Sequence, residues 1–506
     1  MASFWGIITS RPWVGDLLAI SAGLLVPLAF APFEAAWVLF PALALFFATS
    51  LSISPGRAFW RGWLFGLAQF GWGVTWIYYS LHLYSSTPAP LAIAIAGLFA
   101  AFLALFPAVA TYVAVRISGC KPFVLLCLAL PAAWVLAEWV RGLVFSGFPW
   151  LLFGYSQVET PLAGYAPVVG VLGLSWIVAI CASLLLVMVM TPARIKGVLT
   201  VVLGVIWLSG WALAKVDWTH PVGEAIKVSL LQASISQDQK WQPDLLRPTM
   251  EWYRQQTEAN WDSQLIIWPE TALPAYLHHV KPYVDVLGFE AEKYNSNVLI
   301  GLFIKDLETD RYYNSVVSAR SGDDYKKRRL VLLGEYFPFR EQLAILDRWI
   351  RIPKSDIDFG PQTQSLIRVN GQPLGISICF EDAFSSEIRK SLPQATLLVN
   401  VSNDAWFYRS IQPYQHHQIA RMRALEAGRY MLRATNTGVS SIIGPKGEEV
   451  VMSPLFEPAV VTANAQPMMG ATPFVTWGNT PLIIGLLVIL LVPILRSRRV
   501  VTRLNQ

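Results

Sequence analysis

Long apolar stretches fill the chain up to about Leu213 and return once near its end. Over all 506 residues, 54% are hydrophobic and only 14% are charged, whereas an average soluble domain has about 25% charged residues. The segment between about Glu224 and Met468 is far less apolar than the rest. This pattern predicts a membrane region, an inserted globular domain and a closing membrane anchor.

Windows of about 20 apolar residues are long enough to cross the hydrocarbon core of a bilayer. Such windows predict a multi-pass α-helical domain with about eight transmembrane helices, at Trp13–Phe30, Ala35–Leu51, Trp60–Tyr84, Leu91–Val115, Phe123–Val140, Ala163–Met190, Gly197–Leu213 and Pro481–Leu495. We therefore expect a membrane domain of about seven helices at residues 1–218 and a globular domain at residues 219–470. A final helix with a basic tail is expected at residues 471–506.

Lys and Arg residues between the spans indicate the orientation, because they favour the cytoplasmic side of a membrane. With the N-terminus in the cytoplasm, four basic clusters fall on that side, at Arg57 and Arg61, at Arg116 and Lys121, at Arg194 and Lys196, and at Arg496, Arg498, Arg499 and Arg503. The globular domain then lies outside, which in a bacterium is the periplasmic face of the inner membrane. The clusters account for most of the net charge of +6, so we expect no nucleic-acid partner.

The globular domain alternates short β-rich runs with more polar, helical segments such as Pro243–Asp262 and Gln415–Tyr430. The β-rich runs are Ile226–Gln232, Gln264–Trp268, Asn297–Ile304, Ser315–Ala319, Gly375–Cys379 and Thr396–Val401. This alternation predicts a layered α/β domain. The sequence GPKG at Gly444–Gly447, between apolar runs, predicts a hairpin turn.

One cysteine, Cys379, stands alone in this domain, within the sequence GISICFEDAF. In an extended strand, Ile376 and Ile378 face one way while Ser377 and Cys379 face the other. An unpaired thiol in an oxidising compartment indicates a reactive role, although a packed core thiol is the ordinary alternative. The remaining cysteines lie in or beside apolar spans, where small side chains pack readily: Cys120, Cys127 and Cys181.

Reactive side chains also follow other predicted strands. Glu270 occurs in IIWPETALP, and Lys326 and Lys327 occur in DDYKKRRL. Each has an ordinary interpretation as a loop residue or part of a charged surface. With Cys379, however, they suffice for acyl transfer. A thiol with a pKa of about 8.5 needs a base before it attacks, a carboxylate serves as that base, and a buried ammonium stabilises the oxyanion.

The histidines do not indicate a different chemistry. No Cys/His spacing suits zinc, so we expect neither a metal nor a cofactor. His416 is a candidate for lining the site, but a structural role is the simpler interpretation. A cysteine–histidine dyad has no supporting sequence context.

Several motifs occur in a fixed order along the chain: WPE (Trp268–Glu270), Y-x-K-x-x-L (Tyr325–Leu330), G-E-Y (Gly334–Tyr336), I-C-F-E (Ile378–Glu381) and S-N-D-A-W-F (Ser402–Phe407). This order resembles the nitrilase, or carbon–nitrogen hydrolase, superfamily. Further motifs extend the resemblance into the membrane region: EWVRG (Glu138–Gly142), GFPWLLFGYSQ (Gly147–Gln157) and QHHQIARMRALE (Gln415–Glu426). With its flanking spans, almost the whole chain resembles the bacterial apolipoprotein N-acyltransferases.

The resemblance implies an αββα sandwich and assigns roles to the reactive residues. Glu270 is implied as the general base, Lys327 rather than Lys326 as the stabiliser of thiolate and oxyanion, and Cys379 as the nucleophile. Supporting roles are implied for Glu335 and Glu381. We also expect four residues to contact substrate: Trp241, Phe380, Trp406 and His416.

Three residues depart from the pattern of the family. Leu332 replaces a proline, Phe380 replaces a tyrosine after the nucleophile, and Tyr408 replaces a glycine after AWF. The first and third affect loop stiffness or pocket width, and the second removes a phenol hydroxyl. None changes the three reacting groups.

The resemblance implies a two-step reaction. Cys379 takes a fatty acyl chain from a phospholipid, for which phosphatidylethanolamine is the expected donor, and forms a thioester. The N-terminal amine of a diacylglyceryl-cysteine apolipoprotein then accepts the chain, which completes lipoprotein maturation. We expect a monomer embedded in the bilayer.

Two other functions are compatible with parts of the sequence. A membrane-bound nitrilase-type amidase would hydrolyse a small periplasmic substrate with the same three residues, but eight spans exceed what a tether requires. A transporter or receptor would place paired charges along the spans, yet few ionisable groups lie away from the span ends.

Two further features of the membrane region have two interpretations each. Glu138 and Arg141 are spaced to pair on a helix or to bind a lipid headgroup. Aromatic residues near outer span ends form either an interfacial belt or a substrate contact: Trp72, Trp76, Tyr78, Tyr79 and Trp477.

Overall fold

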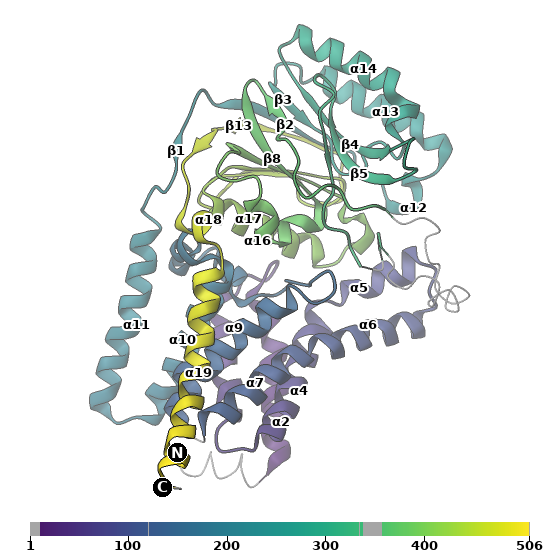
Figure 1. Cartoon of the computed structure of the whole chain (residues 1–506). Coiled ribbons are helices and arrows are strands. Elements are labelled where there is room, and N and C mark those ends of the chain that lie inside the picture. Colours follow the sequence, from purple (N-terminus) through teal and green to yellow (C-terminus); the bar gives the residue numbers. More distant parts are fainter. Residues whose placement is uncertain (1–10, 120, 333, 337–356, 505–506) are drawn as a thin grey trace. The chain divides into compact units, whose positions relative to one another are not determined.

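The computed structural model describes residues 11–119, 121–332, 334–336 and 357–504, with side chains described as far as residue 492 (Figure 1). The predicted packing of Cys120 lies outside these residues. The chain forms two compact units. The first contains Met1–Thr75, Ile93–Val216 and Thr476–Gln506, and the second contains Trp76–Ala92 and Asp217–Val475.

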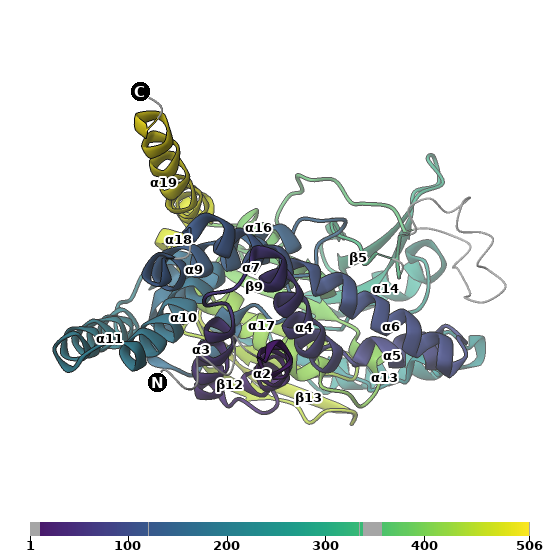
Figure 2. The same cartoon turned by 90° about the horizontal axis from the view of Figure 1, so that it is seen from below.

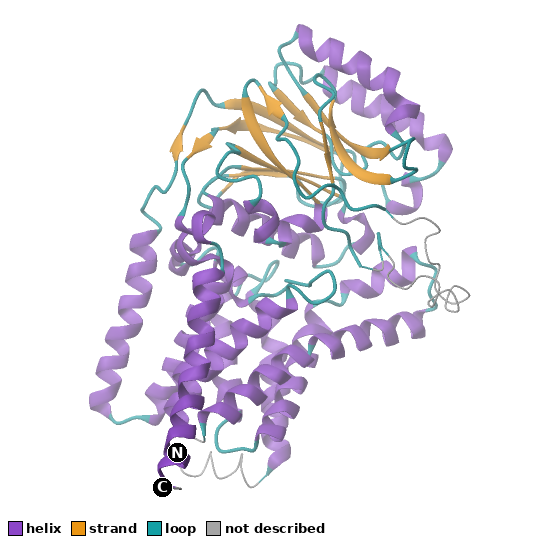
Figure 3. Ribbon diagram, in the orientation of Figure 1, coloured by secondary structure: helices purple, strands orange, loops and turns teal. Residues whose placement is uncertain are grey.

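The first unit is helical (Figure 3). Its main helices are α2 (Pro12–Leu25), α3 (Leu39–Thr49), α4 (Pro55–Gly73), α6 (Ala89–Leu103), α7 (Leu105–Ser118), α9 (Leu130–Arg141), α10 (Ala166–Met190), α11 (Ala193–Leu213) and α19 (Thr480–Leu504). Short segments join them: η1 (Val26–Ala29), η2 (Ala36–Val38), α8 (Pro122–Val124), η4 (Leu125–Ala129), η5 (Phe153–Gln157) and η6 (Pro161–Tyr165). α11 lies at the edge of this unit in two views (Figures 1 and 2), and only 6% of its apolar window is buried.

Among the described residues, five helical segments are long and apolar enough to cross a membrane: Pro12–Ala29, Ala89–Ser118, Pro122–Arg141, Pro161–Met190 and Ala193–Leu213. Two shorter apolar helices, Ala36–Thr49 and Thr480–Val492, coincide with the second and last predicted spans. A multi-pass helical region is therefore confirmed, but the number of eight transmembrane helices is not.

The predicted span Trp60–Tyr84 is wrong as one continuous helix. α4 ends at Gly73, and the following residues form α5 (Trp76–Tyr79) and the π-helical turn η3 (Ser80–Tyr84), which belong to the second unit. Glycines near the end of α4 weaken the helix. Trp76 also makes specific contacts in the second unit: its Nε1 donates to Gln415 Oε1 at 3.1 Å, and its ring meets that of Phe407.

The first unit packs tightly around α4, which contacts both α2 and α7. A Cβ atom on Gly62 would lie 2.2 Å from Thr111 Oγ1, so only glycine permits this approach of α4 and α7. Small residues at such crossings are typical of helices in membranes. The buried Arg61 ties the helices together by donating to Asp16 and to the carbonyls of Thr49 and Pro12.

Glu138 and Arg141 are both buried and interact electrostatically with each other, and hydrogen bonds to further groups hold each of them. Glu138 Oε1 accepts from Trp134 Nε1 and from the amide of Phe153, each at 3.1 Å. Arg141 donates to the carbonyls of Phe148 and Trp150. These contacts fix the loop that follows α9.

The second unit contains two six-stranded sheets. The first has the order β13-β2-β3-β4-β5-β6, formed by Ala459–Ala465, Ile226–Gln232, Leu265–Ile267, Val298–Lys305, Tyr312–Ser318 and Asp324–Lys326. The second has the order β12-β11-β10-β9-β8-β7, formed by Glu449–Met452, Ser441–Ile443, Met431–Thr435, Leu397–Ser402, Gln372–Ile378 and Arg368–Val369. A separate short pair joins β1 (His220–Pro221) to β14 (Met468–Met469).

Helices cover the outer face of each sheet (Figures 1 and 3). α13 (Pro243–Glu258) and α14 (Leu277–Lys293) cover the first sheet, and α16 (Ser385–Arg389) and α17 (Gln412–Ala427) cover the second. Shorter helices are α12 (Gln237–Lys240), η8 (Cys379–Ala383), η9 (Asp404–Phe407) and α18 (Pro473–Trp477). The predicted αββα sandwich is confirmed.

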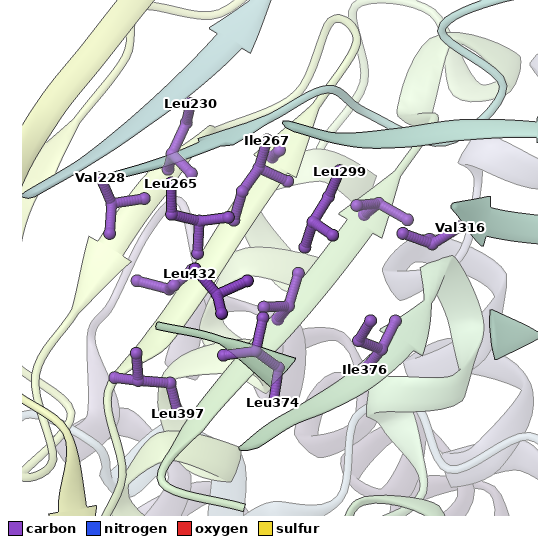
Figure 4. Packing of buried hydrophobic residues seen from close by; sticks show 14 of the residues in the cluster. Val228, Leu230, Leu265, Ile267, Leu299, Val316, Leu374, Ile376, Leu397 and Leu432 are labelled. Carbon is purple, nitrogen blue, oxygen red and sulfur yellow. The ribbon is translucent and has the colours of Figure 1, made fainter. Parts of the chain in front are cut away.

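The two sheets face each other through one apolar core (Figure 4). Val228, Leu265 and Leu299 of the first sheet meet Leu374 and Leu432 of the second (Figure 4). Burial of each such side chain contributes about 1.5–3 kcal/mol, which makes the sandwich a rigid support for the strand ends. All six predicted strands are found, with small shifts at their ends, and Gly444–Gly447 joins the antiparallel β11 and β12 as predicted.

Candidate active site

Glu270 lies on the loop after β3, with its side chain 6% exposed. Its Oε1 accepts from Asn314 Nδ2 at 2.7 Å and from Lys327 Nζ at 3.2 Å. Gly301 on the neighbouring β4 allows this loop to lie close, because a Cβ there would be 2.1 Å from the carbonyl oxygen of Pro269. The Glu270 carboxylate is therefore held in one position by two donors.

Lys327 follows β6 and is 1% exposed. Its Nζ contacts Glu335 Oε1 at 2.7 Å as well as Glu270. Burial lowers the pKa of Lys327, but the carboxylates of Glu270 and Glu335 outweigh it and raise that pKa well above its ordinary value. The side chain is thus a permanently charged ammonium shared by two carboxylates.

Cys379 directly follows β8 and begins η8 with a φ of 50°. Left-handed backbone is uncommon for a residue with a Cβ atom and often marks functional positions. Ile376 and Ile378 lie in the apolar core and anchor the strand, and Asn400 Nδ2 donates to the Cys379 carbonyl at 3.3 Å. The sharp turn therefore starts from a fixed strand end.

The Cys379 thiol interacts electrostatically with both other candidates. Burial raises its pKa well above the ordinary value, the Glu270 carboxylate raises it further, and the Lys327 ammonium opposes both. The resting group is therefore a thiol, which must pass a proton to a base before it can attack. The structure thus brings Glu270, Lys327 and Cys379 together.

Of the two predicted supporting carboxylates, Glu335 contacts Lys327 directly, and Glu381 contacts the backbone beside Lys327 and Cys379. Glu335 accepts from the amide of Val331 at 2.9 Å in addition to Lys327. Glu381 accepts from the amides of Arg328, Arg329 and Ile378 and from the hydroxyl of Tyr325. Glu381 therefore ties the segment carrying Lys327 to the turn carrying Cys379.

His416 lies in a buried ionic network rather than on an open surface. Its Nε2 contacts Asp382 at 2.9 Å and its Nδ1 contacts Asp404 at 2.8 Å, while Arg433 bridges the same two carboxylates. Burial and Arg433 lower the pKa of His416, but the two aspartates outweigh them and raise it to about 9. At 1% exposure, the ring supports the η8 turn, and its predicted contact with substrate stays a prediction.

The other predicted substrate contacts remain predictions. Trp241 is 52% exposed and Trp406 is 40% exposed, so both rings are accessible within the second unit. Trp406 meets Tyr84 edge-on at 5.8 Å, and Phe380 meets Phe384 at 4.9 Å. Of the aromatic residues noted near a span end, Trp76 and Tyr79 pack on Phe407 and Tyr408.

Two residues of the site carried no recognisable motif. Asn314 Nδ2 reaches Glu335 Oε1 at 3.3 Å as well as Glu270, so it spaces the two carboxylates. Lys240, 5% exposed, donates from Nζ to the carbonyl of Glu270 at 3.0 Å. Its sequence context, QDQKW, contains no motif that would single it out. Within the described ranges, no three His, Cys, Asp or Glu side chains are arranged to hold a metal ion.

Comparison with known proteins adds independent information. Residues 22–184 match the family model for the apolipoprotein N-acyltransferase N-terminal domain, and residues 227–474 match that for carbon-nitrogen hydrolase. The chain is 46% identical over 470 residues to an apolipoprotein N-acyltransferase of Methylococcus capsulatus, covering 92% of this chain and 93% of the relative. Relatives of the same description from Coxiella burnetii and Nitrosomonas europaea are 37% and 41% identical, covering 94% and 87% of this chain and 99% and 88% of the relatives.

Proposed function

Because the chain belongs to the apolipoprotein N-acyltransferase family, we propose that Glu270, Lys327 and Cys379 move a fatty acyl chain from a phospholipid to a lipoprotein. The protein is an acyltransferase that acts in lipoprotein N-acylation. The acceptor is the N-terminal amine of a diacylglyceryl-cysteine apolipoprotein. The proposal assigns each step to a side chain of the site.

In the first step, Glu270 takes the proton of the Cys379 thiol, and the sulfur attacks the ester carbonyl of the phospholipid. The oxyanion that forms is stabilised by the Lys327 ammonium, which is held in place before the reaction. Glu270 then returns the proton to the departing alkoxide. A lysophospholipid leaves, and the acyl chain remains on Cys379 as a thioester.

In the second step, Glu270 accepts a proton from the incoming α-amine, which attacks the thioester carbonyl. Lys327 stabilises the second oxyanion in the same position. The thiolate leaves and regains its proton from Glu270, so the enzyme returns to its starting state. The product is an amide, which is more stable than the ester and the thioester before it.

The observation that carries this proposal is the sharing of Lys327 between Glu270 and Glu335 beside the Cys379 thiol. A base must stand next to a thiol of raised pKa, and a fixed cation must stand where negative charge develops. Both requirements are met by buried side chains on the rigid sandwich. No metal or cofactor enters the proposed steps.

The proposed location of the protein in the inner membrane is supported by its apolar helices and by the distribution of its Lys and Arg residues. Five apolar helical segments among the described residues support a bacterial membrane protein. The four basic clusters support the inner membrane, with the catalytic unit at residues 219–470 on the periplasmic side. We further propose phosphatidylethanolamine as the usual donor and a monomer as the active form.

Purified protein supplied with phosphatidylethanolamine vesicles alone tests the first step. We expect intact-mass spectrometry to show one acyl adduct on the parent and none on Cys379→Ala, with lysophospholipid released in equal amount. Rapid release of free fatty acid without an adduct would indicate a hydrolase of the amidase type. An adduct that persists in Cys379→Ala would refute the assignment of the nucleophile.

A further inference from the structure

A second lysine, Lys240, lies buried beside the three proposed reacting groups. It ends the short helix α12, which is fixed because Gln237 Oε1 accepts from Asn403 Nδ2 at 2.9 Å. Its ammonium donates to the carbonyl of Glu270 at 3.0 Å. Among the described residues, no carboxylate lies within ion-pair distance of its Nζ.

A buried cation without an ion-pair partner is costly, since removal from water is not offset by a contacting charge. Lys327, by contrast, contacts two carboxylates. Lys240 is instead surrounded by the Glu270 carbonyl and by the fields of the Glu270 carboxylate and the Cys379 thiol. The burial of Lys240 is therefore best explained by charge that appears during the reaction.

The charges of the site support this explanation. At rest, the carboxylates of Glu270 and Glu335 contact the Lys327 ammonium, and the Glu270 carboxylate also acts on the Lys240 ammonium, so these two negative and two positive charges balance. When Glu270 takes the thiol proton, it becomes neutral while Cys379 becomes negative, and the charges balance again. Without Lys240, the Lys327 ammonium alone would face both the thiolate and the Glu335 carboxylate, so less positive charge would stabilise the thiolate.

We propose that Lys240 is the second cation of the reaction, a positioning residue that holds the Glu270 loop and stabilises the Cys379 thiolate in both half-reactions. The inference rests on the proposed function, because it assumes that Cys379 ionises during turnover. It differs from a purely structural role, in which the hydrogen bond to the Glu270 carbonyl would be the whole contribution.

The protonation state of Lys240 predicts a pH dependence of acylation that a purely structural role would not produce. Burial lowers the pKa of Lys240 to about 8, against the opposing effects of Glu270 and Cys379. The other charged groups acting on Cys379 are Lys327, Asp404 and Glu335. Lys240 is therefore charged below about pH 8 and neutral above it, so acylation of the parent should decline on the alkaline side.

The test compares Lys240→Gln, which keeps a hydrogen-bond donor, with Lys240→Arg, which keeps the charge at all working pH values. Two rates are measured in the full-length protein: alkylation of Cys379 by iodoacetamide, followed by peptide mass spectrometry, and acyl-enzyme formation from phosphatidylethanolamine. Thermal unfolding checks that each variant is folded.

We expect Lys240→Gln to slow both rates about 10-fold to 100-fold near neutral pH. Lys240→Arg should recover most of both rates and lose the alkaline decline. Unchanged rates in Lys240→Gln, or equal losses in the two variants, would overturn the inference. Absence of any acyl-enzyme in the parent would refute the proposed function instead. In that case the alkylation rates of the variants would still show whether Lys240 stabilises the Cys379 thiolate.

Discussion

The Lys327 ammonium contacts Glu335 and Glu270 at 2.7 and 3.2 Å while almost fully buried. Its neighbour Lys326 is partly exposed and pairs weakly with Asp324 at 3.7 Å. Lys326 ends β6 and Lys327 follows it, and successive residues of extended chain point in opposite directions. Lys326 therefore serves as a control for Lys327. One lysine faces the candidate site and the other faces away.

Lys327→Met is expected to slow acyl-enzyme formation by about 100-fold or more, because the oxyanion loses its fixed donor. Lys326→Met should stay within about twofold of the parent, as expected for a surface change. The rate of adduct formation measured by mass spectrometry decides between the two lysines. Equal effects of the two substitutions would contradict the assignment of Lys327.

Tyr408 adopts φ 50° and ψ −159°, a conformation that strongly favours glycine. This explains physically why a glycine is expected at this position. The ring of Tyr408 contacts that of Tyr79 with 5.9 Å between centroids. The chain therefore combines an aromatic contact with backbone strain.

Comparison of Tyr408→Gly with Tyr408→Ala separates the two contributions, because both remove the ring and only glycine relieves the backbone. We expect the glycine variant to be more stable than the alanine variant by about 1–3 kcal/mol. Thermal or denaturant unfolding of the two variants measures the difference. Equal stability would show that the loop relaxes around a Cβ atom.

Site residues could be predicted from the sequence where they lie in a recognisable short motif. Glu270, Lys327 and Cys379 each stand in a short motif, and the order of the motifs led to all three. Asn314 and Lys240 were missed because their roles come from contacts between distant segments. An amide inside a strand and a lysine beside an exposed Trp have many ordinary explanations.

Among the elements, the η8 turn depends on the helix α17 behind it. α17 supplies His416, which contacts Asp382 of η8 and Asp404 of η9. Arg433 of β10 completes the network. The turn that carries Cys379 is thus braced by charged groups from three other elements.

The ionic contacts of His416 with Asp382 and Asp404 predict a specific pH dependence of the stability of the fold. A group whose folded-state pKa is raised stabilises the fold fully below its unfolded pKa, and this effect is lost as the pH rises through the folded value. For His416 the window runs from about 6.5 to about 9. The effect is on the order of 3 kcal/mol for this buried group.

Melting temperatures should therefore fall between about pH 6.5 and about pH 9 in the parent, and much less in His416→Gln. The adjacent His417 provides the control, since burial and Arg433 lower its pKa well below the ordinary value and keep it neutral. His417→Gln should retain the decline of the parent. A decline that is unchanged in His416→Gln would contradict the charged state of His416.

Element types were predictable where local pattern and tertiary packing agree. Strands such as β2 are apolar runs buried between layers, and their positions followed from the sequence. The segment Trp60–Tyr84 was predicted as one span because most of its residues are apolar. Its second half instead packs on η9 of the globular unit. Composition identifies apolar residues, but it does not identify what buries them.

For the whole molecule, the uneven distribution of apolar residues indicated one helical and one α/β part, and the structure divides in this way. The number of transmembrane helices was not predictable from window length alone. α4, for example, includes Arg57, Arg61 and Gln69 and is not among the five apolar segments. Packing within the helical unit lets such a helix bury polar groups.

The central claim for the whole protein is that a thioester on Cys379 lies between donor and acceptor. The most direct measurement isolates the acylated protein, removes the phospholipid, and adds a diacylglyceryl-cysteine peptide while both masses are followed. We predict that the peptide gains one acyl chain as the protein loses one, at equal rates. Acylation of the peptide only when phospholipid is present, or acylation by Cys379→Ala, would contradict the account.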